Sequence, residues 1–147
     1  MLQFVIDTDH LTLLGYGHPL VTHRCAMKVP GALGLPVVTV EEHLRGRLSA
    51  IVQAKDGVGR MLQYSLLERS LRLIHPYPIA PFDPLAEDQF QILRAMRLRI
   101  GTRDQKIAAI ALANNVILCY AQQARFRSGS RPGYRRLVRV IRTHGAS

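Results

Sequence analysis

The sequence predicts an α/β domain in which a central, mostly parallel β-sheet is covered by helices on both faces. Short apolar runs alternate with longer amphipathic stretches, and this alternation is typical of strand–helix–strand units. The chain has 147 residues, 48% of them hydrophobic, which suits one domain with one core. Its apolar runs are too short to cross a bilayer and no signal-peptide pattern precedes them, so we predict a cytoplasmic protein without a membrane partner.

The first part of the chain predicts a buried strand followed by two helices. The apolar run Leu2–Ile6 is the strand, and Asp7-Thr8-Asp9 marks the turn into the first helix. Gly15 to Pro19 breaks the helical pattern. A second amphipathic stretch covers 20–29, before a loop marked by proline and glycine.

The middle and end of the domain repeat this alternation three times. We predict strands at 35–39, 77–83 and 116–119. Thr39-Val40-Glu41-Glu42 has the form of a capping box that opens a helix to Ala54. Further helices are predicted from Asp56 to Leu73, from Pro84 to Leu98 and over Gln105–Asn114.

The positive charge is concentrated at the end of the chain. Residues 1–118 hold thirteen Lys and Arg against ten Asp and Glu, or +3, whereas residues 119–147 hold seven Arg and no acid, or +7. We therefore divide the chain into a domain over 1–118 and a divergent basic tail over 119–147. A basic surface favours polyanions such as RNA or DNA.

Several classes of site are excluded by spacing. Cys25 and Cys119 lie far apart without a CxxC or Cys/His cluster, so we predict reduced thiols rather than a zinc site or a disulfide. The six histidines show no metal-binding spacing, and His43 is expected to face another side of its helix than Glu42. No nucleophile elbow or Gly-rich phosphate loop is present, which argues against a serine hydrolase or a nucleotide-binding protein.

Three carboxylates are candidates for a metal site. Asp7 follows the first strand, Glu42 follows the second, and Asp104 stands at a helix start. Functional groups of parallel sheets gather at the carboxyl ends of the strands, so these acids are expected at one edge. Clustered carboxylates suit Mg²⁺ or Mn²⁺, which bind phosphate oxygens and orient a water for attack.

Each acid also has an ordinary structural interpretation. Glu42 can be the reciprocal partner of Thr39 in the capping box, Asp104 can be stabilised by its place near a helix N-terminus, and Asp7 can form an Asx turn. Singly, each acid favours the structural interpretation. As a set in this order, they favour a metal site.

The motifs around these acids resemble those of the VapC-type PIN-domain ribonucleases, the toxin halves of bacterial toxin–antitoxin pairs. The resemblance covers essentially residues 2–118. It rests on four stretches: Phe4-Val5-Ile6-Asp7-Thr8-Asp9-His10-Leu11, Val38-Thr39-Val40-Glu41-Glu42-His43-Leu44-Arg45-Gly46, Pro81-Phe82-Asp83, and residues 100–114 with the sequence IGTRDQKIAAIALAN.

This resemblance implies a PIN-like three-layer sandwich with the sheet in the middle. It also implies that Asp7 and Asp104 are metal ligands, that Glu42 rather than Glu41 is a further acid of the site, and that Thr8 supports it. The implied activity is Mg²⁺-dependent (or Mn²⁺-dependent) cleavage of RNA, with tRNA as one candidate substrate. The implied partners are a cognate antitoxin and a second copy of the chain in a homodimer.

The tail departs from the family pattern at a point that matters for activity. The family expects T-x-N-x-x-D-F after the last strand, and its Asp completes the site. Here Arg125 stands at the position of that acid and Gln122 at the Asn. A guanidinium in a divalent-cation site repels the metal, so we predict weak or absent cleavage by this chain.

A shifted reading frame accounts for the departure. Codons for Leu118 to Val138 can be chosen so that removal of one T at the Leu118–Cys119 junction gives VTRNRRDFGQVPGLGIDDW, which supplies the missing Asn, Asp, Phe, Pro-Gly-Leu and Trp in family order. The middle bases of the observed codons are nearly fixed, and they agree with the family pattern. We therefore predict that residues from about 119 onward are a frameshifted reading, which the DNA around codon 119 would test.

The competing interpretation is a genuine basic arm. Seven arginines surround Tyr134 and can hold phosphates while the ring stacks on a base. Residues 128–133 have a composition typical of disorder. On this interpretation the chain is a non-catalytic module that binds RNA or an antitoxin, and its acids are helix caps.

Overall fold

Four parallel strands form one sheet in the computed structural model, which describes residues 1–119. The order across the sheet is β3-β2-β1-β4, and every neighbouring pair is parallel. The strands are β1 (Phe4–Ile6), β2 (Leu33–Pro36), β3 (Ile79–Ala80) and β4 (Ile117–Cys119). The predicted parallel sheet is confirmed, and the predictions for the tail beyond residue 119 lie outside the described residues.

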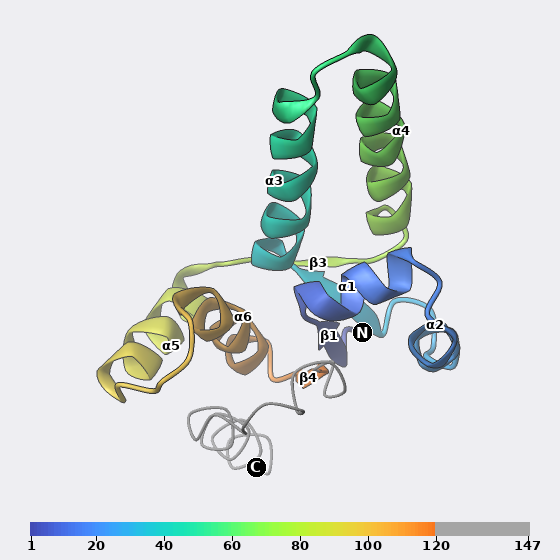
Figure 1. Ribbon diagram of the computed structural model, residues 1–147. Helices are drawn as coiled ribbons and strands as arrows, with labels where there is room; N and C mark the ends of the chain where they lie inside the picture. The colour runs from blue at the N-terminus through green and yellow to red at the C-terminus, as the bar shows by residue number, and fades with distance from the viewer. Residues whose placement is uncertain (120–147) are drawn as a thin grey trace.

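Two helices connect each strand to the next (Figure 1). The helices are α1 (Thr8–Gly15), α2 (Pro19–Ala26), α3 (Val37–Gln53), α4 (Gly57–Ile74), α5 (Pro84–Ala95) and α6 (Thr102–Ala113). Parallel strands need such crossover connections because a tight turn cannot join them. Within residues 1–119, no helix combines the length and apolar character needed to cross a membrane.

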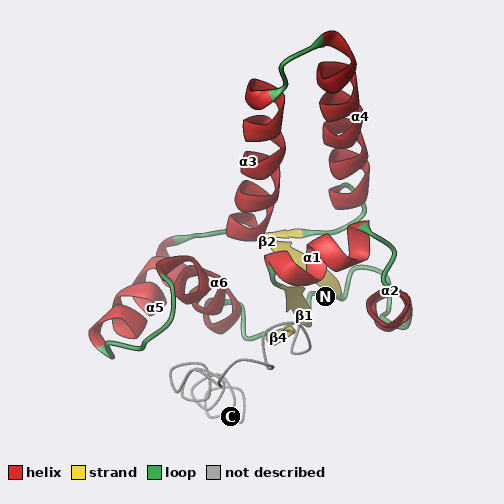
Figure 2. Ribbon diagram, in the orientation of Figure 1, coloured by secondary structure: helices red, strands yellow, loops and turns green. Residues whose placement is uncertain are grey.

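Neighbouring residues of β1 enter different cores on the two faces of the sheet. Val5 packs with α5 and α6, whereas Ile6 packs with Leu11 of α1 and with Leu35 of β2. Successive side chains of a strand point to opposite faces, so the sheet is the middle layer between two groups of helices (Figure 2). The predicted three-layer α/β architecture is confirmed.

The junction of β2 and α3 differs from the prediction. The second strand ends at Pro36, and α3 begins at Val37 with no side-chain cap. Thr39 lies in the first turn of the helix, fully buried, and its hydroxyl donates to the Ile6 carbonyl oxygen at 3.3 Å. The predicted capping box is therefore wrong, because the Thr39 hydroxyl ties the helix to β1 instead of capping it.

Helix α5 begins as predicted and ends three residues early. Asp83 caps it by accepting from the Ala86 amide at 2.9 Å, and Pro84 follows at the helix start. The predicted end was Leu98, but Arg97 has φ +48°, in the left-handed region. That conformation stops a right-handed helix.

Helices α3 and α4 form an antiparallel hairpin that extends away from the sheet (Figure 1). Only the ends near the sheet bury side chains: Val38 and Thr39 in α3, and Ser70 and Ile74 in α4. Within the sheet, Gly34 lets β2 approach its neighbours closely. A Cβ there would lie 2.7 Å from the Pro78 carbonyl oxygen, so a larger residue would push the strands apart.

Candidate functional site

Asp7 lies where β1 ends and α1 begins. Its carboxylate accepts from the His10 amide at 2.8 Å and so caps α1. The same oxygen lies 3.0 Å from His10 Nδ1. Asp7 thus serves as a helix cap, bonded to the third residue after it, whereas the predicted Asx turn would bond it to the second. The side chain is 16% exposed, which leaves it within reach of a solute.

Glu42 lies in the second turn of α3 and contacts two other elements. One carboxylate oxygen accepts from the Thr8 hydroxyl at the start of α1, and the other accepts from Arg103 of α6. Thr39 bonds elsewhere, so Glu42 has no capping role with it. The contacts join segments 34 and 61 residues apart in sequence, which marks Glu42 as a tertiary contact residue.

Asp104 lies in the first turn of α6, whose N-terminus favours a negative side chain. The helix begins at Thr102, three residues before the predicted Gln105. The Arg103 guanidinium bonds to Glu42 and lies 3.9 Å from an Asp104 carboxylate oxygen. A positive charge therefore stands beside two of the three predicted acids.

The last strand brings Cys119 to the same edge as Asp7. The register pairs Ile6 with Cys119, so the carboxyl ends of β1 and β4 lie side by side. Burial raises the pKa of the Cys119 thiol, and the nearby Asp7 carboxylate adds to the rise. Cys25 and Cys119 are both free thiols.

The three acids suit a hard divalent cation by donor type but do not form a cage in this arrangement. Carboxylate oxygens are the ligands that Mg²⁺ and Mn²⁺ prefer. Among residues 1–119, however, no three His, Cys, Asp or Glu side chains lie close enough together to hold one ion. Arg103 supplies the positive charge beside Glu42 and Asp104. An ion that used both carboxylates would have to displace this guanidinium.

Two polar neighbours of Glu42 belong to other contacts. Glu41 is exposed and pairs with Arg45 one turn later in the helix. His43 Nε2 lies 3.0 Å from the Ser70 hydroxyl of α4. His43 thus faces α4, on another side of α3 than Glu42, and that difference in side was predicted.

Arg103 is the residue of this site that the sequence did not single out. It stands directly before Asp104 in the helix start, and only its link to Glu42 reveals its position. The signal that could have revealed Arg103 was its position as a basic residue directly before the candidate acid Asp104. His10 was likewise noticed only as part of its motif, although it contacts Asp7.

No protein-family model and no curated protein sequence matches the chain. Solved structures do match it. A chain of DNA-bound VapBC from Salmonella typhimurium is 20% identical, with 90% of this chain and 95% of that chain covered at a TM-score of 0.63. A chain of VapBC2 from Rickettsia felis, bound to a DNA fragment from the promoter, is 18% identical, with 86% and 92% covered at a TM-score of 0.64.

A chain of FitAcB from Neisseria gonorrhoeae is also similar, with 20% identity, 79% of this chain and 85% of that chain covered, and a TM-score of 0.60. At such identities the likeness shows the fold. The chain has the PIN-like α/β fold. Its parallel sheet is flanked by helices. Of the three candidate acids, Asp7 follows β1, Glu42 lies in the second turn of α3 and Asp104 lies in the first turn of α6.

Proposed function

We propose that the protein is a metal-dependent endoribonuclease of the toxin type, which hydrolyses phosphodiester bonds of RNA, tRNA included. One observation carries the proposal: Glu42 of α3 and Asp104 of α6 both contact the cation Arg103, at the sheet edge where Asp7 follows β1. Two acids from separate helices are thus held beside one positive charge, and Glu42 also bonds to Thr8, the residue after Asp7. A purely structural acid needs only its own helix.

In the proposed enzyme, Asp7, Glu42 and Asp104 would hold Mg²⁺ or Mn²⁺. A bound ion would supply charge neutralisation at the phosphodiester and a more acidic water for in-line attack. Thr8 holds the Glu42 carboxylate by its hydroxyl hydrogen bond. Arg103 is the residue that must release Glu42 when an ion takes its place.

The proposed partners are a cognate antitoxin and a second copy of the chain. The similar structures named above include VapBC assemblies from two organisms, which supports an antitoxin partner. The homodimer rests on the family resemblance of the motifs.

We further propose that the chain as it stands cleaves weakly. All ten of its carboxylate side chains precede residue 105, so none follows β4, where the resemblance calls for the last acid. The test is a version in which the residues after Leu118 are VTRNRRDFGQVPGLGIDDW. This version should cleave more strongly than the present chain. Equal cleavage by the two would contradict the proposed impairment.

The experiment that tests the nuclease proposal compares substitutions of two candidate acids with the same substitutions of two exposed acids outside the site. Labelled RNA is incubated with the full chain, or with the restored-tail version, in Mg²⁺ and in chelator. Glu42→Gln and Asp104→Asn should reduce cleavage to the chelator level. Glu41→Gln and Asp88→Asn, which remove exposed acids of the same type, should leave it unchanged. Metal-independent cleavage, or no cleavage by either parent, would overturn the proposal.

The second candidate is a non-catalytic module that binds RNA or an antitoxin. The observation that favours it is Arg103, which already neutralises Glu42 without a metal. A titration with Mn²⁺ separates the two candidates. Binding that is lost in Asp7→Asn and Asp104→Asn supports the enzyme. RNA binding that is unaffected by both changes, without binding of Mn²⁺, supports the non-catalytic module.

A further inference from the structure

Positive residues are dense between the last turn of α5 and the first turns of α6. Residues 94–106 contain five of the thirteen Lys and Arg residues that precede residue 119, and one acid, Asp104. The five are Arg94, Arg97, Arg99, Arg103 and Lys106. This stretch leads along the chain to Asp104 of the candidate site.

Four of these five cations have no ion pair with a described residue. Arg103 pairs with Glu42 and Asp104, whereas the remaining four are absent from every salt bridge within residues 1–119. All ten acidic side chains of the chain lie within those residues. No carboxylate side chain of the tail is therefore available to neutralise the four. On the hairpin, Arg45 and Arg72 each pair with a glutamate one turn away, whereas Lys55 and Arg60 have no ion pair with a residue among 1–119.

Two of the four cations, from different helices, lie near the same aromatic ring. Arg94 of α5 and Lys106 of α6 approach the ring of the same residue, Phe90, at 5.7 and 5.8 Å from its centroid. Glu87, which lies three residues before Phe90 in α5, accepts from Gln91 at 2.5 Å. Like charges held near one ring repel each other. A bound anion would relieve that repulsion.

Arg97 occupies a backbone position that favours glycine. It follows Met96, the C-terminal cap of α5, and has φ +48°. Glycine is the common residue at this place because a side chain is strained in the left-handed region. The exposed Arg97 side chain makes no ion pair with a residue among 1–119 that would offset the strain. Such a strained residue is an indication of a functional role.

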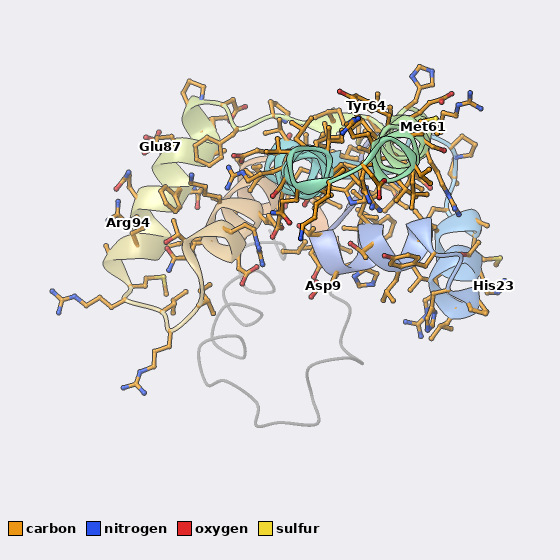
Figure 3. The ribbon with its side chains drawn as sticks, turned by 45° about the horizontal axis from the view of Figure 1, so that its top comes forward. Asp9, His23, Met61, Tyr64, Glu87 and Arg94 are labelled. Carbon is orange, nitrogen blue, oxygen red and sulfur yellow. The ribbon has the colours of Figure 1, made fainter. Side chains whose placement is uncertain are left out.

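We propose that this α5–α6 basic surface, formed by Arg94, Arg97, Arg99 and Lys106, binds the phosphodiester backbone of single-stranded RNA and leads it to the acids beside Asp104. The inference rests on the proposed nuclease function and adds where its substrate binds. Lys and Arg contacts to phosphates give affinity and position without reading the base sequence. Figure 3 shows Arg94 on α5, away from Met61 and Tyr64 of α4 in the hairpin.

The test compares two double variants of the full chain. Arg97→Gln with Arg99→Gln removes two exposed cations from the proposed surface. Lys55→Gln with Arg60→Gln removes two exposed cations from the outer end of the hairpin, and none of the four has an ion pair with a described residue. The probe is a fluorescent oligouridylate, titrated in EDTA at several salt concentrations.

The surface variant should lower the slope of log affinity against log salt by about 1.4, because each phosphate contact to a single strand contributes about 0.7. Its affinity near 0.1 M salt should fall roughly tenfold. The hairpin variant should change both far less. Equal losses in the two variants, or no loss in the surface variant, would overturn the proposal.

Arg97→Gly separates lost binding from lost folding. It removes the charge and also relieves the strained backbone, so it should weaken oligouridylate binding while the melting temperature stays the same or rises. Weaker binding accompanied by a lower melting temperature, or unchanged binding, would contradict a direct phosphate contact at this residue.

Two further comparisons identify the class of ligand and distinguish the RNA-binding proposal from the nuclease proposal. Polyglutamate of matched length should bind more weakly than the RNA. If it binds equally and with the same loss in the surface variant, the surface recognises acidic peptides and the RNA proposal is wrong. Binding in EDTA involves no metal-dependent cleavage, so failure of the nuclease proposal would leave the difference between the double variants measurable.

Discussion

Helix α6 and the α3–α4 hairpin both carry regularly spaced apolar residues, yet they bury them to different extents. Six of the twelve residues of α6 are buried. Helices α3 and α4 have 17 and 18 residues, and each has two buried ones. The hairpin exposes large apolar side chains far from the sheet: Leu48, Val52, Val58, Met61, Leu62 and Tyr64.

The difference follows from where each helix lies relative to the sheet. Helix α6 lies against it, and the small side chains Ala108, Ala109 and Ala111 allow the close approach. The hairpin points away from it (Figure 1). Exposed apolar surface of this kind commonly marks an interaction site. Apolar periodicity thus predicts a helix in both regions but does not say what covers the apolar face.

The largest expected effect distinguishes these two regions by their contribution to stability. Ile110 of α6 is completely buried, so Ile110→Ala should lower the free energy of unfolding by about 2–5 kcal/mol. Leu62 of α4 is 56% exposed, so Leu62→Ala, which also removes three carbons, should change it by about 0.5 kcal/mol or less. Urea denaturation measures both.

A second protein concentration makes this comparison sharper. If Leu62→Ala destabilises the chain at high concentration and not at low concentration, a second copy covers the hairpin in solution. If it costs as much as Ile110→Ala at every concentration, the contrast between the two regions is wrong.

The elements of the fold were predictable because they depend on local patterns. Apolar runs predicted the strands, and Pro84 predicted the start of α5. Boundaries that depend on tertiary contacts were not predictable. Thr39 had the right neighbours for a cap, but its hydroxyl bonds to Ile6, 33 residues earlier in the chain. The early end of α5 depends on the backbone of Arg97.

For the candidate site, the sequence supplied the acids and the structure supplied their contacts. Asp7, Glu42 and Asp104 were selected from strand and helix ends. Nothing local to these residues indicates that Thr8 and Arg103 bond to the Glu42 carboxylate. The projection of the hairpin was also not predictable, because its apolar pattern resembles that of a covered helix.

The next effect concerns the ion pairs of the two regions. Arg103→Gln removes the guanidinium that competes with a metal for Glu42 and Asp104. We expect Mn²⁺ affinity to rise roughly fivefold, because a partly exposed ion pair is worth up to about 1 kcal/mol. Titration calorimetry measures the affinity.

The matched control for this prediction lies on the hairpin. Arg72→Gln breaks the exposed pair with Glu68 and removes the same charge. It should leave Mn²⁺ affinity unchanged, as long-range effects of exposed charges are screened by salt. Equal gains in both variants would mean that net charge, rather than release of the acids, controls metal binding.

The smallest expected effect is a pH dependence of the hairpin. Burial lowers the pKa of His43, and the nearby Arg47 lowers it further. Arg47 also donates to the Ser70 hydroxyl oxygen at 3.2 Å, so the Ser70 hydroxyl can donate its hydrogen to neutral His43. Protonation of His43 removes that acceptor and adds a like charge beside Arg47. The base of the hairpin therefore depends on a neutral imidazole, whereas α6 depends on apolar contacts.

The sign of this dependence follows from the lowered pKa. As the pH falls below about 6.5, the unfolded chain binds a proton at His43 more readily than the folded chain does, so folding stability decreases. Because the side chain is only half-buried, the decrease should stay below about 1 kcal/mol. Urea denaturation between pH 7.5 and about pH 5 should show a smaller decrease for His43→Gln than for the parent. His23→Gln, which changes an exposed histidine of α2, should retain the parent's dependence. A parent-like profile for His43→Gln would show that the two helices are held together without this contact.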